Sequence, residues 1–197
     1  MNRIIQLPLK ILMTCCFLIL ASTLAFAGQA QPVDGTHLQT VYFDAARQGD
    51  IPTLRAYYTA GLSPNVADQK GYTALILSAY HGKTDAVEYL LAHADVNACQ
   101  EDNSGNTALM GAIFKGNFGA IKALISADCD IDQANSNGQT AAMFATLFNR
   151  TDIISALTEA GANLTAKDSS GNSLVDIALS QGNYELAEAL MEKRTAN

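Results

Sequence analysis

The chain has 197 residues, a net charge of −7 and 49% hydrophobic residues, with only 16% charged residues, four cysteines and no tryptophan. This length fits one domain of modest size, and the apolar composition excludes a disordered, highly charged tail. The acidic pI, near 4.8, argues against partners that are held by positive protein charge, such as nucleic acids and anionic membranes.

The first 27 residues have the three-part pattern of a secretory signal peptide. A basic, acid-free start precedes an apolar run over residues 11–26, and Ala25-Phe26-Ala27 places small residues where a signal peptidase reads them. A membrane anchor is the alternative, but the apolar run is shorter than the roughly 20 residues of a spanning helix. We therefore expect cleavage after Ala27 and a periplasmic or secreted protein, with residues 28–37 as a linker.

Removal of this segment changes the charge and the cysteine content of the chain. It takes away two basic residues and no acid, so the remaining 170 residues would carry a net charge of −9. Cys99 and Cys129 would remain, in a compartment that permits disulfides. No second apolar run approaches membrane-spanning length. We expect the exported chain to have no membrane span and to be a monomer.

An internal repeat of about 33 residues occupies the rest of the chain. The segments GYTALILSAYHG, GNTALMGAIFKG, GQTAAMFATLFN and GNSLVDIALSQG begin at residues 71, 105, 138 and 171. A degenerate copy ends at Gly49, which gives an array of five units. Each segment is followed by a second amphipathic stretch, such as TDAVEYLL or FGAIKALI, and by a polar turn. Such units are stable only when neighbours stack and bury their apolar faces.

Each unit is predicted to be a helix, a tight turn and a second, antiparallel helix. Apolar residues spaced by three and four positions, such as Val87, Leu90 and Leu91, give the second helix one buried face. The tight turn holds glycine or, once, Asn149, and both residue types tolerate a positive φ. A hydroxyl residue two positions after each leading glycine is placed to cap the first helix. These capping residues are Thr73, Thr107, Thr140 and Ser173.

The unit resembles the ankyrin repeat, which reads roughly G-x-T-P-L-H-x-A-A-x-x-G and continues with a second helix and a G-A-D-V-N turn. The G-x-T-A pattern in consecutive copies and A-D-V-N at 94–97 carry the resemblance. It implies an all-α solenoid of five helix-turn-helix units with short hairpin fingers, over residues 38–197. The expected repeats are residues 38–67, 68–101, 102–134, 135–167 and 168–197.

The sequence departs from the family pattern at one position that matters for stacking. The family's histidine bonds the threonine between neighbouring units. Here its places are taken by Ile76, Met110, Met143 and Asp176. We therefore expect weaker polar bonding between repeats, with apolar packing in compensation.

The repeat register brings Cys99 and Cys129 onto neighbouring fingers. A disulfide between them would close a segment of about 30 residues and contribute ~3 to 4 kcal/mol on the loop-entropy estimate. The alternative is two unpaired small residues, and the distance between their Cα atoms decides between these possibilities.

The residue inventory gives no support to an enzyme. None of the three histidines stands in a nucleophile or metal motif, and the chain has no Gly-rich phosphate loop, HExxH or paired CxxC. A metal site from His81, His93, Cys99 and Cys129 is conceivable, but the spacing matches no compact zinc motif. We therefore expect no catalytic residue, no metal site and no cofactor.

The resemblance implies a partner-binding surface on the concave face, at the fingers and at the exposed end of each first helix. Carried onto this chain, that surface comprises Arg47, Tyr72, Tyr80, His81, Phe114, Lys115, Leu147 and Phe148. Aromatic residues flanked by polar groups are typical of an interface centre. We expect Tyr80 and Phe148 to be the exposed pair, with Phe114 and Leu147 packed between adjacent first helices.

These features predict a non-catalytic periplasmic protein that binds a partner protein through its concave face. Secreted bacterial ankyrin proteins that the chain resembles suggest two alternatives. One is a haem or metal carrier that supports a periplasmic catalase, with haem held by His81, His93 or a tyrosine, and the other is an immunity-type inhibitor of a toxic enzyme. An effector secreted into a host would have the same fold and differ only in its destination.

Overall fold

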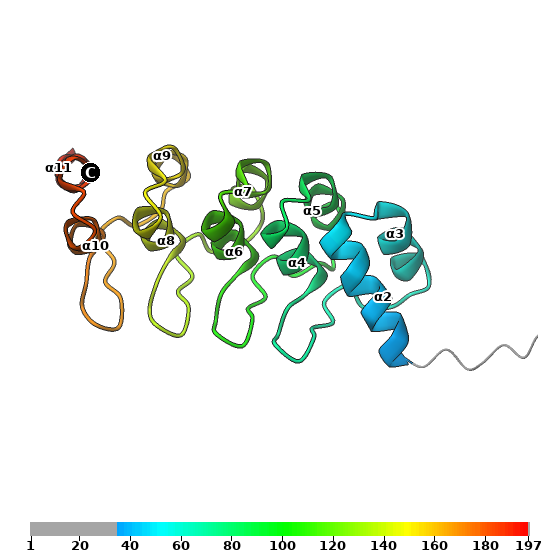
Figure 1. Cartoon of the computed structure of the whole chain (residues 1–197). Coiled ribbons are helices and arrows are strands. Elements are labelled where there is room, and N and C mark those ends of the chain that lie inside the picture. Colours follow the sequence, from blue (N-terminus) through cyan, green and yellow to red (C-terminus); the bar gives the residue numbers. More distant parts are fainter. Residues whose placement is uncertain (1–34, 197) are drawn as a thin grey trace, which may run out of the picture. The chain divides into compact units, whose positions relative to one another are not determined.

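The computed structural model describes residues 35–196, and the predicted signal peptide lies outside the described residues. Helices in five antiparallel pairs fill this region, as Figure 1 shows, so the predicted all-α solenoid of five units is confirmed. The pairs are α2 (Gly35–Gln48) with α3 (Ile51–Thr59), α4 (Ala74–Tyr80) with α5 (Thr84–Leu91), α6 (Ala108–Lys115) with α7 (Phe118–Ile125), α8 (Ala141–Leu147) with α9 (Thr151–Glu159), and α10 (Leu174–Ser180) with α11 (Tyr184–Ala196). Because α2 begins at Gly35, residues 35–37 are helical and do not belong to a linker.

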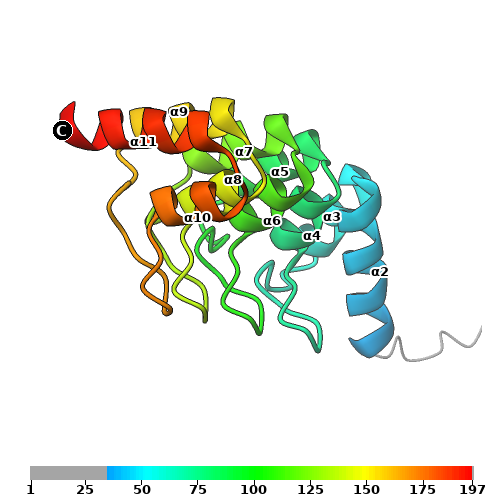
Figure 2. The same ribbon diagram turned by 60° about the vertical axis from the view of Figure 1, so that its left-hand side comes forward.

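The helices form two layers with fingers on one side. The first helices α4, α6, α8 and α10 lie side by side in one layer. The second helices α5, α7, α9 and α11 form the other layer, above them in Figure 1, and the loops before each first helix project below as fingers (Figures 1 and 2). Within residues 35–196, no helix combines the length and the apolar character that a bilayer crossing requires.

Small side chains allow the first helices to pack closely. Ala74, Ala108 and Ala141 are at most 2% exposed and stand at the start of consecutive first helices. The second helices bury larger residues on one face, among them Val87 and Leu90 of α5, as the spacing of apolar residues predicts. The core therefore runs continuously through the stack, and no unit has a core of its own.

The helix termini are set by the residues that the sequence singles out. Thr107 Oγ1 accepts a hydrogen bond from the amide of Met110 at 3.4 Å, and Thr73, Thr140 and Ser173 cap their helices in the same way. At Ser173 the carboxylate of Asp176 accepts in return from the Ser173 amide, which completes a capping box. Asn149 has a φ of 53°, as predicted for the one turn that lacks glycine.

An Asx turn at the start of each finger orders the finger loop. Asp102 Oδ1 accepts hydrogen bonds from the amides of Ser104 and Asn106 at 2.8 and 2.9 Å. The equivalent residues Asp68, Asn135 and Asp168 accept in the same pattern. The ordered fingers then bond to one another, since the amide of Ser136 donates to the carbonyl of Ser104 at 3.0 Å.

Asparagine side chains supply polar bonds between repeats at places other than that of the family's histidine. Asn117 Nδ2 donates to the carbonyls of Ala79 and Tyr80, at 2.8 and 2.9 Å, and so satisfies the end of the preceding first helix. Asn135 Nδ2 donates to Asn106 Oδ1 of the neighbouring finger at 2.9 Å. The contacts that the family's histidine would make are replaced by bonds at the turns and fingers.

The structure joins Cys99 and Cys129 in a disulfide, with their Cα atoms 5.2 Å apart. Cys99 follows α5 and Cys129 follows α7, so the closed segment contains α6 and α7. Gln133 Nε2 adds a hydrogen bond to the carbonyl of Cys99 at 3.1 Å. The bridge therefore ties together the loops on either side of one helix pair in the middle of the stack.

Replacement of both cysteines by serine is expected to lower the free energy of unfolding by ~3 to 4 kcal/mol, because the unfolded chain regains the freedom of a long loop. Urea unfolding followed by far-ultraviolet circular dichroism measures this loss. A reductant should destabilise the wild-type protein by the same amount and leave the double-serine variant unchanged. Equal stability of oxidised and reduced wild-type protein would contradict the prediction.

Candidate partner-binding groove

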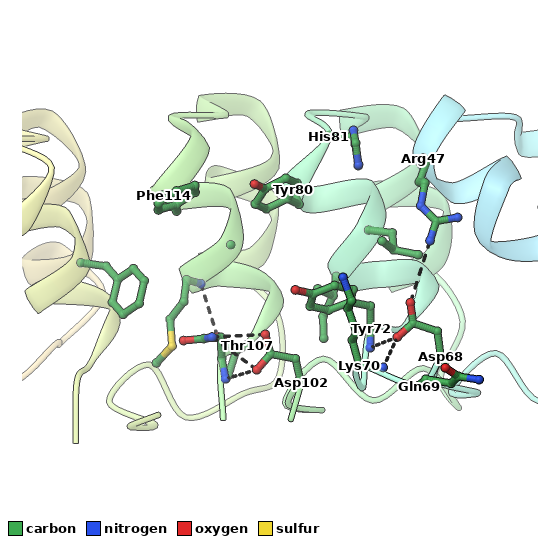
Figure 3. Close-up of a pocket in the computed structure, with 16 residues that line it drawn as sticks. Arg47, Asp68, Gln69, Lys70, Tyr72, Tyr80, His81, Asp102, Thr107 and Phe114 are labelled. Carbon is green, nitrogen blue, oxygen red and sulfur yellow. Dashed lines mark hydrogen bonds and ion pairs between the residues drawn. The ribbon is translucent and has the colours of Figure 1, made fainter. Parts of the chain in front are cut away.

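A groove of about 770 Å³ is lined by α2, by two fingers and by the first helices α4, α6 and α8. Of the eight residues that the sequence predicts for partner binding, Arg47, Tyr72, Tyr80, His81 and Phe114 line this groove. Figure 3 shows the rings of Tyr80 and Phe114 side by side at one rim, opposite the finger residues Lys70 and Asp102. The structure thus brings residues from three predicted repeats into one site.

Three aromatic residues form a continuous row beside the groove. We call this row, which consists of Tyr80, Phe114 and Phe148, the aromatic ledge. The rings of Tyr80 and Phe114 stack with their centroids 6.0 Å apart, and Phe148 meets Phe114 edge to face at 5.0 Å. Both arrangements are favourable for aromatic pairs. Tyr80 and Phe114 share one repeat position, nine residues after the leading glycine, and Phe148 stands one residue further along in its own repeat. Residues at the ends of three consecutive first helices therefore supply one apolar surface.

The exposed pair of the ledge differs from the predicted one. Tyr80 is 37% and Phe114 is 44% exposed, whereas Phe148 is half-buried. The prediction is confirmed for Tyr80 and wrong for Phe148, which contacts the rings of Phe114 and Phe144, and for Phe114, which is exposed. Leu147 is also half-buried, and neither Leu147 nor Phe148 is among the residues that line the groove.

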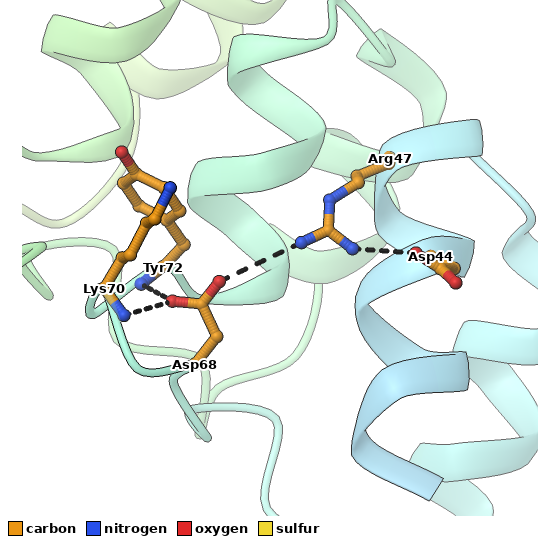
Figure 4. Close-up of polar contacts among 5 residues, drawn as sticks. All are labelled: Asp44, Arg47, Asp68, Lys70 and Tyr72. Atoms are coloured by element: carbon orange, nitrogen blue, oxygen red, sulfur yellow. Dashed lines mark hydrogen bonds and ion pairs between the residues drawn. The ribbon is translucent and has the colours of Figure 1, made fainter. Parts of the chain in front are cut away.

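Arg47 connects helix α2 to the first finger beside the groove (Figure 4). Its guanidinium lies 2.8 Å from the carboxylate of Asp44 and 3.9 Å from that of Asp68. Asp68 also accepts hydrogen bonds from the amides of Lys70 and Tyr72, at 2.8 and 3.0 Å. These two ion pairs link the finger to α2 on the side of the groove.

The turn end of the groove has a positive electrostatic character. Lys115 Nζ lies 5.1 Å from the ring centroid of Tyr80, in a cation–π contact. The pKa of His81 is lowered from its ordinary value, first by burial and then by nearby positive charges. Those charges belong to Arg47, Lys83 and Lys115. His81 is therefore neutral at neutral pH and adds no further charge there.

The floor and far wall of the groove include residues that sequence reasoning missed. Gly111 lies in the floor, and Phe144 of α8 lines the groove beyond α6. Asp68 and Asp102 line the finger side. A signal for the two aspartates was present, because each stands three residues before a repeat glycine, where an Asx turn is expected. Gly111 and Phe144 share one repeat position, six residues after the leading glycine, which the family pattern does not single out.

The structure does not bring together the residues of the conceivable metal site. Cys99 and Cys129 are bonded to each other. His93 is outside the groove, and its ring stacks on Tyr58 at 4.1 Å and meets Tyr89 edge to face at 4.8 Å. Among the described residues, no cluster of three or more His, Cys, Asp or Glu side chains is placed to hold a metal ion.

Paired helices stacked in register, with ordered fingers between them, define a helical repeat protein. The sequence model of the family described as "Ankyrin repeats (3 copies)" matches residues 42–135 and 110–197. The chain therefore belongs to the ankyrin repeat family, whose repeats are generally protein–protein interaction modules and are typically non-catalytic.

Three relatives illustrate the range of proteins that contain similar repeats. The chain is 34% identical to the photoreceptor ankyrin repeat protein of Homo sapiens over 54% of this chain and 24% of that protein. It is 31% identical to a putative ankyrin repeat protein of Rickettsia bellii over 56% of this chain and 62% of the relative. A putative ankyrin repeat protein of Pseudomonas aeruginosa is 44% identical over 23% of this chain and 26% of the relative. The chain thus spans less than two thirds of each of these relatives.

Replacement of Asp102 by alanine is expected to lower the free energy of unfolding by about 1 to 2 kcal/mol, because two backbone amides lose their acceptor. Hydrogen exchange should become faster at the amides of Ser104 and Asn106. Asp102→Asn is the matched control, because Asn135 makes the same two bonds in the next finger. Loss of protection in the asparagine variant, or none in the alanine variant, would contradict the role given to this carboxylate.

Proposed function

We propose that this chain is a non-catalytic binding protein that acts outside the cytoplasm and holds a partner protein in the groove beside the aromatic ledge. The observation that carries the proposal is the exposure of Tyr80 and Phe114, two large apolar side chains stacked on each other at the rim of a groove. Interface centres are enriched in aromatic residues, and scattered exposure of single apolar residues carries no such information.

The proposed periplasmic location is supported by two independent features. The basic start, apolar run and Ala25-Phe26-Ala27 are typical of a cleaved export signal. The Cys99–Cys129 disulfide suits an oxidising compartment, because thiols of cytosolic proteins are kept reduced. In the periplasm the bridge would persist and stabilise the repeat stack around the groove.

Alanine substitution of Tyr80 and Phe114 together is expected to weaken capture of the partner from periplasmic extract by about tenfold or more, because these exposed rings would be central contacts. Immobilised wild-type and variant proteins can be compared by quantitative mass spectrometry of what each one retains. The matched control is Phe118→Ala with Tyr184→Ala, since these aromatics are 53% and 72% exposed but begin second helices away from the groove. Equal recovery by wild type and the Tyr80/Phe114 variant would show that the groove is not the binding site.

Expression of the full chain in a Gram-negative host is expected to give a periplasmic protein that begins at Gly28. Mass spectrometry of the intact protein from the periplasmic fraction measures the cleavage site and the two-hydrogen difference between the disulfide and the free thiols. Ala27→Arg should block processing, because the peptidase requires a small residue before the cut. Phe26→Leu is the control, since it leaves both small residues in place. Unprocessed wild-type protein in the cytoplasm would refute the location.

A further inference from the structure

Gly111 stands in the middle of α6 without a structural reason for being glycine. Its backbone is helical, and an added Cβ would meet no atom nearer than Tyr80 Cδ2 at 3.9 Å, an ordinary contact distance. Gly119 of α7 is different, because a Cβ there would clash with the side chain of Thr84. Glycine inside a helix lowers helix stability relative to alanine. Gly111 therefore costs stability that neither backbone conformation nor packing requires.

The missing side chain opens a notch in the floor of the groove. The equivalent residues of the neighbouring first helices are Leu77 and Phe144, and both line the same groove. Tyr80 and Phe114 stand at the rim above them, as Figure 3 shows for the labelled rings. The notch is thus bounded by Leu77 and Phe144, with Gly111 between them and the exposed part of the aromatic ledge at its edge. Its walls are apolar, and they suit one large apolar side chain.

Positive and negative side chains are unevenly distributed around the groove. On the finger side, Lys70 lies beside Asp68 and Asp102, which accept hydrogen bonds from backbone amides and keep their negative charge. Lys70, Lys83 and Lys115 form no salt bridge within residues 35–196. The charges that perturb His81 are likewise all cationic. The local charge at the turn end of the groove is therefore positive, although the chain as a whole carries −7.

We propose that the groove binds an acidic segment of the partner protein, which inserts one aromatic or large aliphatic side chain into the notch over Gly111 and places carboxylates near Lys70 and Lys115. This inference rests on the proposed function and names the chemistry of the partner. The acidic remainder of the chain repels such a segment only weakly at a distance, because screening limits charge effects to about 8–10 Å at physiological salt. Close contacts with the lysines therefore decide the preference.

Selection of a displayed library of short random peptides on the wild-type protein tests the chemistry directly. We expect enriched sequences to contain several Asp or Glu residues around one Phe, Tyr, Trp, Leu or Ile. The individual peptides should bind Gly111→Leu about tenfold more weakly than wild type, because the added side chain fills the notch. Ala92→Leu adds nearly the same bulk, one carbon atom fewer than Gly111→Leu, at an exposed position that ends α5, and it should leave the affinity unchanged.

Two further variants separate charge and stability from the shape of the notch. Lys70→Glu combined with Lys115→Glu should weaken the selected peptides by about tenfold or more, whereas Lys122→Glu on the second helix α7 should not. Gly111→Ala should raise the midpoint of thermal unfolding by about 2–4 °C and still weaken binding, because alanine favours the helix but narrows the notch. If Gly111 had only a structural role, the alanine variant would not gain thermal stability while it loses affinity for the peptides.

The results distinguish this inference from the proposed function. Enrichment of basic or uncharged peptides, no enrichment at all, or equal binding to wild type and Gly111→Leu would overturn the inference. If the inference fails in this way but the Tyr80/Phe114 variant still captures less partner protein than wild type, the groove binds a protein segment of a different chemistry. If peptides of the expected type displace that partner from wild type, both proposals are supported together.

Discussion

The close stacking of first helices on small residues is the constraint on which the rest of this structure depends. Ala79, Ala112 and Ala145, fully buried in consecutive first helices, let neighbouring units approach until their fingers and turns hydrogen bond. A single unit has too little apolar surface to fold alone, so this stacking stabilises every helix. It also brings the middles and the ends of consecutive first helices together, and the aromatic ledge and the notch both follow from that adjacency.

The sequence alone predicted what local chemistry determines. The period, the capping hydroxyls and the positive φ of Asn149 follow from residues that act within one unit, and the register placed Cys99 and Cys129 near each other. The exposure of the ledge was not predictable in the same way. Phe148 is covered because Phe144 of its own helix and Phe114 of the previous helix both contact it. Exposure at such positions depends on side chains of two helices at once, and a repeat pattern does not specify their rotamers.

The charge of the groove also could not be inferred from the composition of the chain, because it depends on where the charged side chains lie. The net charge of −7 suggests an acidic surface, yet the aspartates nearest the groove serve the backbone of the fingers. Asp68 and Asp102 each accept two amide hydrogen bonds, which orders a loop and directs the carboxylate toward the main chain. Lysines have no comparable local partner in a turn, so their charge stays available to a ligand. The local charge at the turn end of the groove therefore depends on where Arg47, Lys83 and Lys115 lie and not on the net charge of the chain.

The disulfide and Gly111 have opposite effects on the stability of the same helix pair: the disulfide raises it and the glycine lowers it. The segment closed by the Cys99–Cys129 bridge contains α6, which is the helix that Gly111 weakens. In a stack held by nearest-neighbour contacts, a weak unit in the middle would let the two halves separate. A covalent bridge across that unit limits the loss to the helix itself. The stability that the glycine removes from the floor of the groove is thus offset by the disulfide that spans the same helix pair.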